Sequence, residues 1–413
     1  MFALMMSAMT LMSCGEGDHR VPTINEVTGD KDKDNSGSDN KEDDNNGTND
    51  ENTDEDGMYS WEKDRTEIPD YTDMVLLYGG NHARTTFNWA STRLQSYVSY
   101  ADTNNAEHWL FDAFLFLEIY DAGSGGANVT FATGYKDSST GLPYNSATKD
   151  DWQALINYLF STTYNLSALD KEVATVAGRI GTPPTKRKVI ISIPEPIKYY
   201  NTSNTSSSTQ YWGKVDNKTL DFSKNEDRVT ACKWFVDQVR AAFDKMNYQN
   251  IELAGFYWLA EKSTDTEAIM TSVADYLHQY KYSFNWIPYF NATGYSNWKL
   301  YGFDYAFLQP NYFFNTSTPI SRLKEAASQA QKAGMAMEME FDENVLAYYN
   351  SPKATRLSDY MQAFRTYNVW DTQRIAYYQG NSAVHYLRLS TNATDQELYH
   401  EFCNFVITRP IRP

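Results

Sequence analysis

Short apolar runs alternate with longer amphipathic stretches from about residue 71 to the end of the chain. Eight runs can be distinguished, and most of them are apolar at successive positions, not only at alternate ones. Strands of a parallel sheet have this pattern when both faces are covered. The runs span residues 73–80, 108–120, 188–196, 251–261, 282–290, 303–312, 334–342 and 374–380.

The stretches between these runs have helical periodicity. Residues 321–333 form one amphipathic segment, and Gly334 follows it as a helix-ending residue. Between the third and fourth runs, apolar residues recur at steps of three and four: Val229, Cys232, Phe235, Val239, Phe243 and Met246. The segment 294–302 is too short for a good helix, so an irregular unit is expected there.

Eight repeats of a strand followed by a helix predict an α/β protein, a single (β/α)8 TIM barrel with long βα loops, preceded by a disordered acidic tether. Residues 121–150 and 198–223 are rich in Gly, Asn, Ser and Thr, and both follow predicted strands. Barrels carry their functional loops at these strand ends.

The predicted tether contains no periodic apolar position. Residues 15 to 57 hold 15 acidic and 4 basic side chains, which is −11 of the net charge of −17. Such a segment cannot bury enough apolar surface to fold. We therefore divide the chain into a signal segment (residues 1–14), the tether (15–66) and the barrel domain (67–413).

Cys14 ends a short apolar run that is too brief to span a bilayer. The ending Leu-Met-Ser-Cys resembles a bacterial lipobox, which implies lipidation of Cys14 and a bacterial outer membrane lipoprotein that is surface-exposed or faces the periplasm. An ordinary signal-peptide remnant is the alternative. The positively charged start of a signal peptide is missing, so we expect the true start to lie upstream.

Composition excludes some partners and favours one. The acidic net charge argues against nucleic acid and against a basic membrane-binding face, so any membrane contact should come from the lipid anchor alone. No Cys or His motif has metal-ligand spacing, and we expect no metal and no cofactor. Aromatic residues make up 15% of the chain, with 31 Tyr and 10 Trp. Aromatic surfaces of this kind suit carbohydrate ligands.

The run 334–342 separates its side chains by parity. Glu338, Glu340 and Asp342 alternate with three apolar residues, so the acids share one face of the predicted strand. The apolar face suits packing against helices, which directs the acids towards the barrel axis or its mouth. A buried carboxylate without a cation is costly, so function is favoured over a merely structural role.

A second carboxylate, Glu261, ends the fourth run beside Tyr257 and Trp258. Hydrolysis of a glycosidic bond needs two carboxyl groups, one to protonate the leaving oxygen and one to attack, or to activate water. We therefore predict Glu261 as acid/base and Glu340 as nucleophile or base. Glu195, held in the turn Ile-Pro-Glu-Pro after the third run, is the strongest substitute.

Other residues near predicted strand ends mix hydrogen-bond donors with flat aromatic faces, as a sugar subsite does. Asp112, Glu338 and Asp342 are further catalytic or substrate-binding candidates. The remaining candidates for substrate binding are Asn81, His82, Arg84, Tyr257, Trp258, Trp286, Tyr289, Gln309, Asn311 and Tyr312. Packing or capping is the alternative for each of them.

From about Asp70 to Arg409 the chain resembles domain-of-unknown-function family 4855. The resemblance rests on the segments DMVLLYGG, EHWLFDAFLFLEI, GFYWLAE, QPNY and EMEFDE. It implies a glycosidase-like barrel, often in lipoproteins of polysaccharide-utilising bacteria. Glu261 and Glu340 also resemble the strand-four acid and strand-seven nucleophile of the large retaining glycosidase clan, although Ala260 stands where that clan usually has Asn.

Three functions remain open at this point. The first is a glycoside hydrolase at the cell surface, and the second is a non-catalytic surface glycan-binding protein on a barrel scaffold. A carbohydrate esterase would need an activated Ser or a metal, and the sequence shows neither motif. A common pocket for two carboxyl groups distinguishes the first function from the second.

Overall fold

A closed barrel of eight parallel strands forms the centre of the protein in a computed structural model, which describes residues 68–79, 87–122, 128–136, 140–201, 208–349 and 353–412. The strands are joined around the barrel in the order β1-β15-β14-β13-β12-β11-β8-β4. Each of the eight predicted runs overlaps one of them, so the predicted (β/α)8 fold is confirmed. Their bounds are β1 Asp73–Tyr78, β4 Ala113–Leu117, β8 Arg187–Ile193, β11 Ile251–Trp258, β12 Ser283–Trp286, β13 Tyr305–Leu308, β14 Ala336–Phe341 and β15 Ile375–Gln379.

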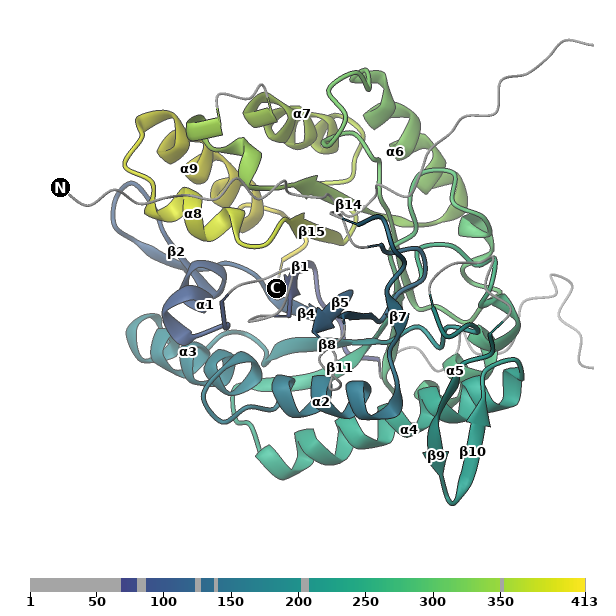
Figure 1. Cartoon of the computed structure of the whole chain (residues 1–413). Helices are drawn as coiled ribbons and strands as arrows, with labels where there is room; N and C mark the ends of the chain where they lie inside the picture. Colours follow the sequence, from purple (N-terminus) through teal and green to yellow (C-terminus); the bar gives the residue numbers. More distant parts are fainter. Residues whose placement is uncertain are drawn as a thin grey trace, which may run out of the picture. The chain divides into compact units, whose positions relative to one another are not determined.

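Helices surround these strands (Figure 1). They are α1 Ser91–Val98, α2 Lys149–Leu159, α3 Asn165–Ile180, α4 Asn225–Met246, α5 Glu267–His278, α6 Ser321–Ala333, α7 Lys353–Thr366, α8 Ala383–Leu389 and α9 Ala393–Ile407. Gly334 ends α6 in the left-handed conformation, with φ 64°, as predicted. Between β12 and β13 the chain forms only a short 3-10 helix, η2 (Tyr295–Asn297), which confirms the expected irregular unit.

The connections after β4 and β8 carry short strands of their own. After β4, three strands form a small sheet in the order β5-β6-β7: β5 Tyr120–Ala122, β6 Asn128–Thr130 and β7 Asn145–Ser146. After β8, β9 (Tyr211–Val215) and β10 (Lys218–Asp221) form an antiparallel hairpin. A second pair, β2 (Ser99–Ala101) with β3 (Glu107–Trp109), lies between α1 and β4.

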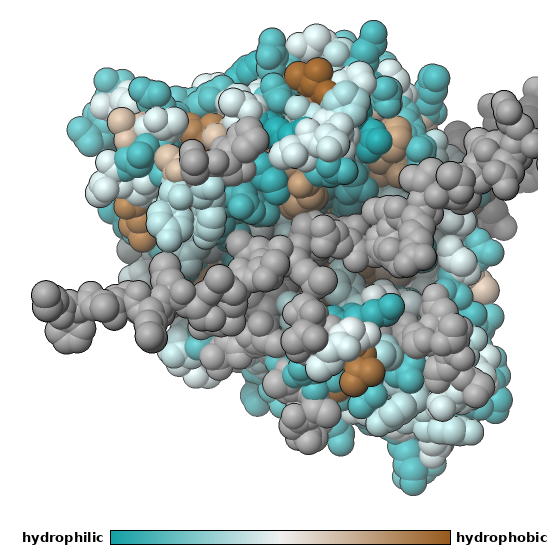
Figure 2. All heavy atoms as spheres, turned by 45° about the horizontal axis from the view of Figure 1, so that its top comes forward, coloured by the Kyte–Doolittle hydropathy of each residue, from teal (hydrophilic) through white to brown (hydrophobic). Residues whose placement is uncertain are grey.

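The core consists of the barrel strands and the helix faces that cover them. All six residues of β1, all five of β4 and all seven of β8 are buried. On the face drawn in Figure 2, hydrophobic residues of the described part are isolated among hydrophilic ones. Within the described residues, no helix has both the length and the apolar character needed to cross a bilayer.

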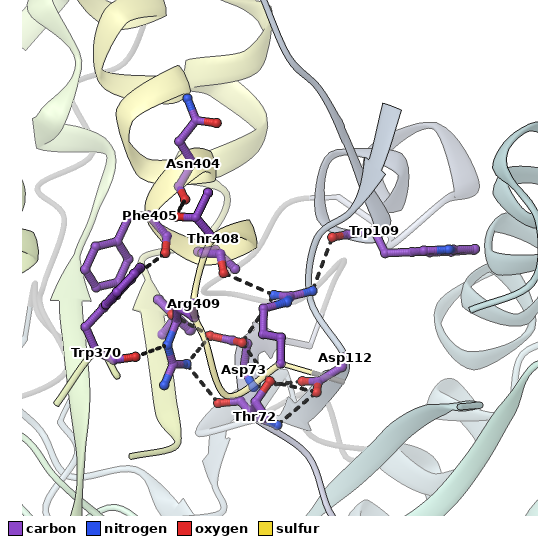
Figure 3. Close-up of polar contacts among 12 residues, drawn as sticks. Thr72, Asp73, Trp109, Asp112, Trp370, Asn404, Phe405, Thr408 and Arg409 are labelled. Atoms are coloured by element: carbon purple, nitrogen blue, oxygen red, sulfur yellow. Dashed lines mark hydrogen bonds and ion pairs between the residues drawn. The ribbon is translucent and has the colours of Figure 1, made fainter. Parts of the chain in front are cut away.

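Two ion pairs meet at Asp73, at the amino-terminal end of the barrel (Figure 3). Arg409, which follows α9, forms an ion pair with Asp73 at the start of β1, and both side chains are fully buried. Arg409 also donates to the carbonyl of Trp370 at 3.0 Å. Arg412 reaches the other oxygen of Asp73 at 3.2 Å. These contacts join the end of the chain to the first strand of the barrel.

Candidate active site

The two faces of β14 differ as their sequence predicts. Phe341 packs on Phe402 of α9 with ring centres 5.1 Å apart, so the odd-numbered positions of β14 face the helices. Glu338 and Glu340 have the opposite parity, and they pair in register with Ala376 and Tyr378 of β15. Both carboxylates are 1% exposed. The structure therefore places them on the inner face of the barrel wall, with Glu340 nearer the carboxyl ends of the strands.

Glu340 is buried but hydrogen-bonded. Its Oε2 accepts the backbone N–H of Asn311 at 2.7 Å and the hydroxyl of Tyr360 at 2.6 Å. Burial and, to a smaller extent, the negative charge of Glu261 raise the pKa of Glu340, whereas the hydrogen bonds lower it, and the net result is a pKa of about 7. Near neutral pH this carboxyl group can therefore exist in both its protonated and ionised forms.

Glu261 lies three residues beyond the end of β11 and is half-buried. Its Oε1 accepts a hydrogen bond of 3.0 Å from the side-chain amide of Gln309. Gln309 and Asn311 belong to one short segment after β13, and this segment binds Glu261 through the first residue and Glu340 through the second. Both carboxylates therefore bind the same segment at the mouth of the barrel, and the charge of Glu261 contributes to the raised pKa of Glu340.

One predicted aromatic residue, Tyr289, lies beside Glu261, and a second, Tyr257, lies on the neighbouring strand β11. The backbone of Tyr289 forms an isolated parallel β-bridge with that of Gln309. Burial and the charge of Glu261 raise the pKa of the Tyr289 hydroxyl. Tyr257 pairs in register with Asn285 and Ser192, and it is 3% exposed. Tyr289 is half-buried, so its ring is more accessible than that of Tyr257.

Tyr312 supports the site from outside it. Its ring packs on Tyr360 with centres 5.7 Å apart, and its hydroxyl donates to Asp359 at 2.7 Å. The guanidinium of Arg356 lies 4.0 Å from the centre of the Tyr312 ring. With 4% of its surface exposed, Tyr312 holds Tyr360 in place and offers little surface to a ligand.

The expectation that Trp258 and Trp286 bind substrate is corrected by the structure. Both side chains are fully buried. Trp258 packs on Phe284 at 5.8 Å, and Trp286 stacks on Phe303 at 5.0 Å. Both rings have the parity that faces the helices, since the neighbouring inward positions are taken by Tyr257 and Asn285. They form part of the packing between the barrel and its helices.

Asp112 is also corrected, because it precedes β4 and so lies at the amino-terminal end of the barrel, away from the mouth. Its carboxylate accepts the backbone N–H groups of Thr72 and Asp73 at 2.9 and 2.7 Å (Figure 3). Burial and the charge of Asp73 raise its pKa. Asp112 therefore stabilises the start of β1 and belongs to the ion-pair network around Arg409.

Glu195 lies at the mouth but binds the loop after β6. Its two oxygens accept the backbone N–H and the hydroxyl of Thr133, each at 2.7 Å. Burial raises its pKa. Asp342, 7% exposed, accepts the N–H of Asn344 at 2.8 Å and so begins the short 3-10 helix η3 (Glu343–Val345). Both acids support loops of the mouth.

Some predicted residues lie outside the described part of the chain. They are Cys14, Asn81, His82 and Arg84.

Two residues of the site were missed by the sequence analysis. Glu118 directly follows β4, so the search for carboxylates at strand ends that identified Glu261 could also have found Glu118. No local sequence signal marks Tyr360 on α7.

Glu118 is 1% exposed, and its Oε1 accepts the N–H of Ile119 at 2.8 Å. Gly79, after β1, packs against the same carboxylate, because a Cβ atom there would lie 2.3 Å from Oε2. In the described residues no group of three or more His, Cys, Asp and Glu side chains is arranged to hold a metal. The site as described is therefore built from carboxylates, tyrosines and amides.

The fold and the site define a (β/α)8-barrel protein with a carboxylate pair at the carboxyl ends of its strands. The chain belongs to the family described as "Domain of unknown function (DUF4855)", whose model matches residues 73–404. The predicted family is thereby confirmed. A comparison with curated proteins finds no match.

Solved structures with a similar chain course include two chitinases and one enzyme of another kind. The chitinase from Ipomoea carnea is 10% identical, with a TM-score of 0.37 over 80% of this chain and 99% of that chain. The chitinase from Chromobacterium violaceum is 12% identical, with a TM-score of 0.27 over 65% and 68%. A mutant tryptophan synthase alpha-subunit from Pyrococcus furiosus is 9% identical, with a TM-score of 0.34 over 82% and 98%.

Proposed function

We propose that the protein is a glycoside hydrolase that acts on an oligo- or polysaccharide through Glu340 and Glu261. One observation carries the proposal: a single segment after β13 holds both carboxylates, through Gln309 and Asn311, and the charge of one raises the pKa of the other. Two carboxyl groups with different protonation states are what hydrolysis of a glycosidic bond requires.

The raised pKa of Glu340, about 7, bears on which group is the acid. A general acid must carry a proton at the pH of catalysis, and burial favours this form. The N–H of Asn311 can only donate, so a proton on Glu340 would reside on Oε1, the oxygen that does not accept this bond. On this physical ground we propose Glu340 as the acid and Glu261 as the ionised partner, the reverse of the roles that we predicted from the sequence and that the glycosidase resemblance implies.

Kinetics of two variants test both the function and the roles. The soluble protein is first screened against plant, host and microbial glycans to find a substrate. Glu340→Gln and Glu261→Gln should each lower turnover by about 100-fold or more, because an amide can neither donate the proton nor attack. Glu340→Gln, the variant that lacks the proposed acid, should lose less activity on aryl glycosides, because good leaving groups need little protonation.

Asp244→Asn serves as the matched control, because Asp244 is exposed in the last turn of α4, which ends just before the start of β11 and so lies near the amino-terminal end of the barrel. Its turnover should equal that of the parent protein. Full activity in both Glu340→Gln and Glu261→Gln would refute the proposal. If glycans bind equally well to the parent and both variants, and none is cleaved by any of them, the protein is a glycan-binding barrel instead.

We also propose that the protein acts at the cell surface through a lipid on Cys14. The proposal rests on the Leu-Met-Ser-Cys ending and on the polar segment that follows it. Cys14→Ala should move the protein from the membrane fraction to the soluble fraction. A variant that stays in the membrane fraction without an uncleaved signal segment would place the anchor elsewhere.

A further inference from the structure

Three exposed tyrosines gather on the rim of the barrel mouth. Tyr348 and Tyr349 belong to the 3-10 helix η4 (Ala347–Tyr349), which follows β14, and Tyr386 lies on α8, which follows β15. Their exposed fractions are 77%, 42% and 39%. We call this set the tyrosine rim. It lies on the two connections that follow β14 and its neighbour β15, so it belongs to the same end of the barrel as Glu340.

The three rings are close to one another. Tyr348 and Tyr349 meet edge to face, with ring centres 5.2 Å apart and an interplanar angle of 85°. Burial raises the pKa of Tyr349, and so do the charges of Glu343, Tyr348 and Tyr386. Tyr386 comes from another connection, whose start is tied to the connection of the pair by hydrogen bonds from Asn381 and Ser382 to Glu343. Two nearly perpendicular rings offer flat surfaces in two directions.

The backbone beneath the tyrosine rim is anchored. The N–H of Ala347 donates to Asp395 at 2.8 Å. Glu343 accepts the N–H groups of Asn381 and Ser382, at 3.0 and 2.6 Å, and so ties the connection after β14 to the connection after β15. A fixed backbone reduces the entropy that would be lost when the rings bind a ligand.

Packing does not explain why these rings remain exposed. Other large exposed hydrophobic residues, such as Leu142, Leu300 and Ile320, lie singly on different segments, which is ordinary for a protein surface. The tyrosine rim differs from these residues because it gathers exposed aromatic rings, each with a hydroxyl group, at the mouth of the barrel. Rings with one polar end suit ligands that are partly apolar and partly hydrated, such as sugars, better than a dry protein interface.

We propose that the tyrosine rim is a carbohydrate-binding subsite that holds sugar units of a chain whose scissile bond lies at Glu340 and Glu261. This inference rests on the proposed glycoside hydrolase function and adds the class of substrate. Tyr348 lies eight residues beyond Glu340 in the chain, which limits the separation of their Cα atoms to about 29 Å, a span that an oligosaccharide can cover. Because a sugar chain must occupy the tyrosine rim and the carboxylate pair at once, the proposal predicts a preference for a chain of several sugar units over a disaccharide.

Affinity electrophoresis of the full chain tests the subsite without requiring turnover. Native gels would contain soluble xylan, galactomannan, mixed-linkage glucan or glycol chitin. The parent protein should be retarded by at least one of them, and the double variant Tyr348→Ala with Tyr349→Ala should lose at least about fivefold in affinity, since stacked aromatic contacts are worth about 1 kcal/mol or more. Tyr386→Ala should show a smaller loss in the same direction.

Tyr367→Ala is the matched control. Tyr367 is 36% exposed and follows α7, so it lies near the amino-terminal end of the barrel strands. Its retardation should equal that of the parent protein. Absence of retardation of the parent in all four gels would overturn the subsite, and so would equal retardation of the parent and the double variant.

A second measurement separates failure of the subsite from failure of the proposed function. Once a glycan that the parent protein cleaves has been found, cleavage rates can be compared. The double variant should lose activity on long chains of that glycan and keep its activity on a short aryl glycoside. If Glu340→Gln abolishes cleavage while the double variant cleaves long chains normally, the result supports the proposed hydrolase and contradicts the subsite. If the double variant is no longer retarded but Glu340→Gln and Glu261→Gln cleave glycans normally, the result supports the tyrosine rim as a binding site. It contradicts the proposed catalytic pair.

Discussion

The hydroxyl of Tyr360 donates a 2.6 Å hydrogen bond to Glu340 from helix α7, which follows β14 in the chain. Both side chains are fully buried, with exposed fractions of 0% and 1%. Burial disfavours the ionised form of Glu340, whereas this bond favours it. The pKa of the carboxyl group therefore depends on a residue that no local pattern in the sequence connects to it.

Replacing Tyr360 with Phe should raise the pKa of Glu340 further, because the ionised form loses one of its hydrogen bonds. We expect an increase of about half to one unit, the usual scale of one hydrogen bond. A carbon-13 NMR titration of the Glu340 carboxyl group measures it directly. Tyr97→Phe is the control, since Tyr97 is equally buried and donates to Gln379 at 3.0 Å. An unchanged or lower pKa in Tyr360→Phe would contradict this account.

Glu340→Gln should stabilise the protein, and more at pH 8 than at pH 5. The pKa of about 7 in the folded state lies above the ordinary value of 4.5, so the folded protein binds this proton more tightly than the unfolded chain. The contribution of Glu340 to stability is complete below pH 4.5 and is lost as the pH rises through 7. A neutral amide avoids this loss and can still accept the bonds from Asn311 and Tyr360.

Melting temperatures at the two pH values measure the effect, which should amount to a few degrees at pH 8. Glu325→Gln, on the exposed side of α6, should change the melting temperature little at either pH. A variant Glu340→Gln that melts at a lower temperature than the parent at pH 8 would show that the carboxylate is stabilising when ionised.

Arg409→Met should destabilise the barrel strongly. Arg409 and Asp73 are both fully buried, so the change leaves a buried carboxylate without its closest cation. Loss of one partner of a buried pair costs about 3–5 kcal/mol. Lys224→Met is the comparison, because Lys224 and Asp221 are 3.8 Å apart with side chains 54% and 21% exposed. An exposed pair of this kind contributes about 1 kcal/mol or less.

Urea denaturation of the two variants gives the free energies of unfolding for this comparison. The Arg409 variant should unfold at a much lower urea concentration than the Lys224 variant. Equal losses in the two would mean that Arg412, 3.2 Å from Asp73, neutralises the carboxylate on its own.

Trp258→Phe should lower stability without changing retardation in polysaccharide gels. The indole is fully buried and its N–H donates to the hydroxyl of Thr266 at 3.3 Å, so the change leaves a small cavity and removes a hydrogen bond. The expected cost is about 1–2 kcal/mol. Weaker retardation with an unchanged melting temperature would restore Trp258 as a ligand-binding residue and weaken the case for the tyrosine rim.

The sequence by itself determined the eight strands, the irregular unit before β13 and the parity of Glu338 and Glu340. Each of these depends on residues close together in the chain, through hydrophobic periodicity or strand alternation. On β14 alternation also identified the inner face, because its two faces differ in polarity. On β11 it could not, since both faces are apolar, and Trp258 faces the helices while Tyr257 faces inward.

Only the tertiary structure decided where strand ends fall and which distant groups meet. Asp112 stands just before β4, so a shift of the expected strand start by a few residues moved it to the opposite end of the barrel. The hydrogen bonds from Gln309 to Glu261 and from Tyr360 to Glu340 join segments 48 and 20 residues apart. Such contacts depend on barrel closure and side-chain direction, which local periodicity does not encode.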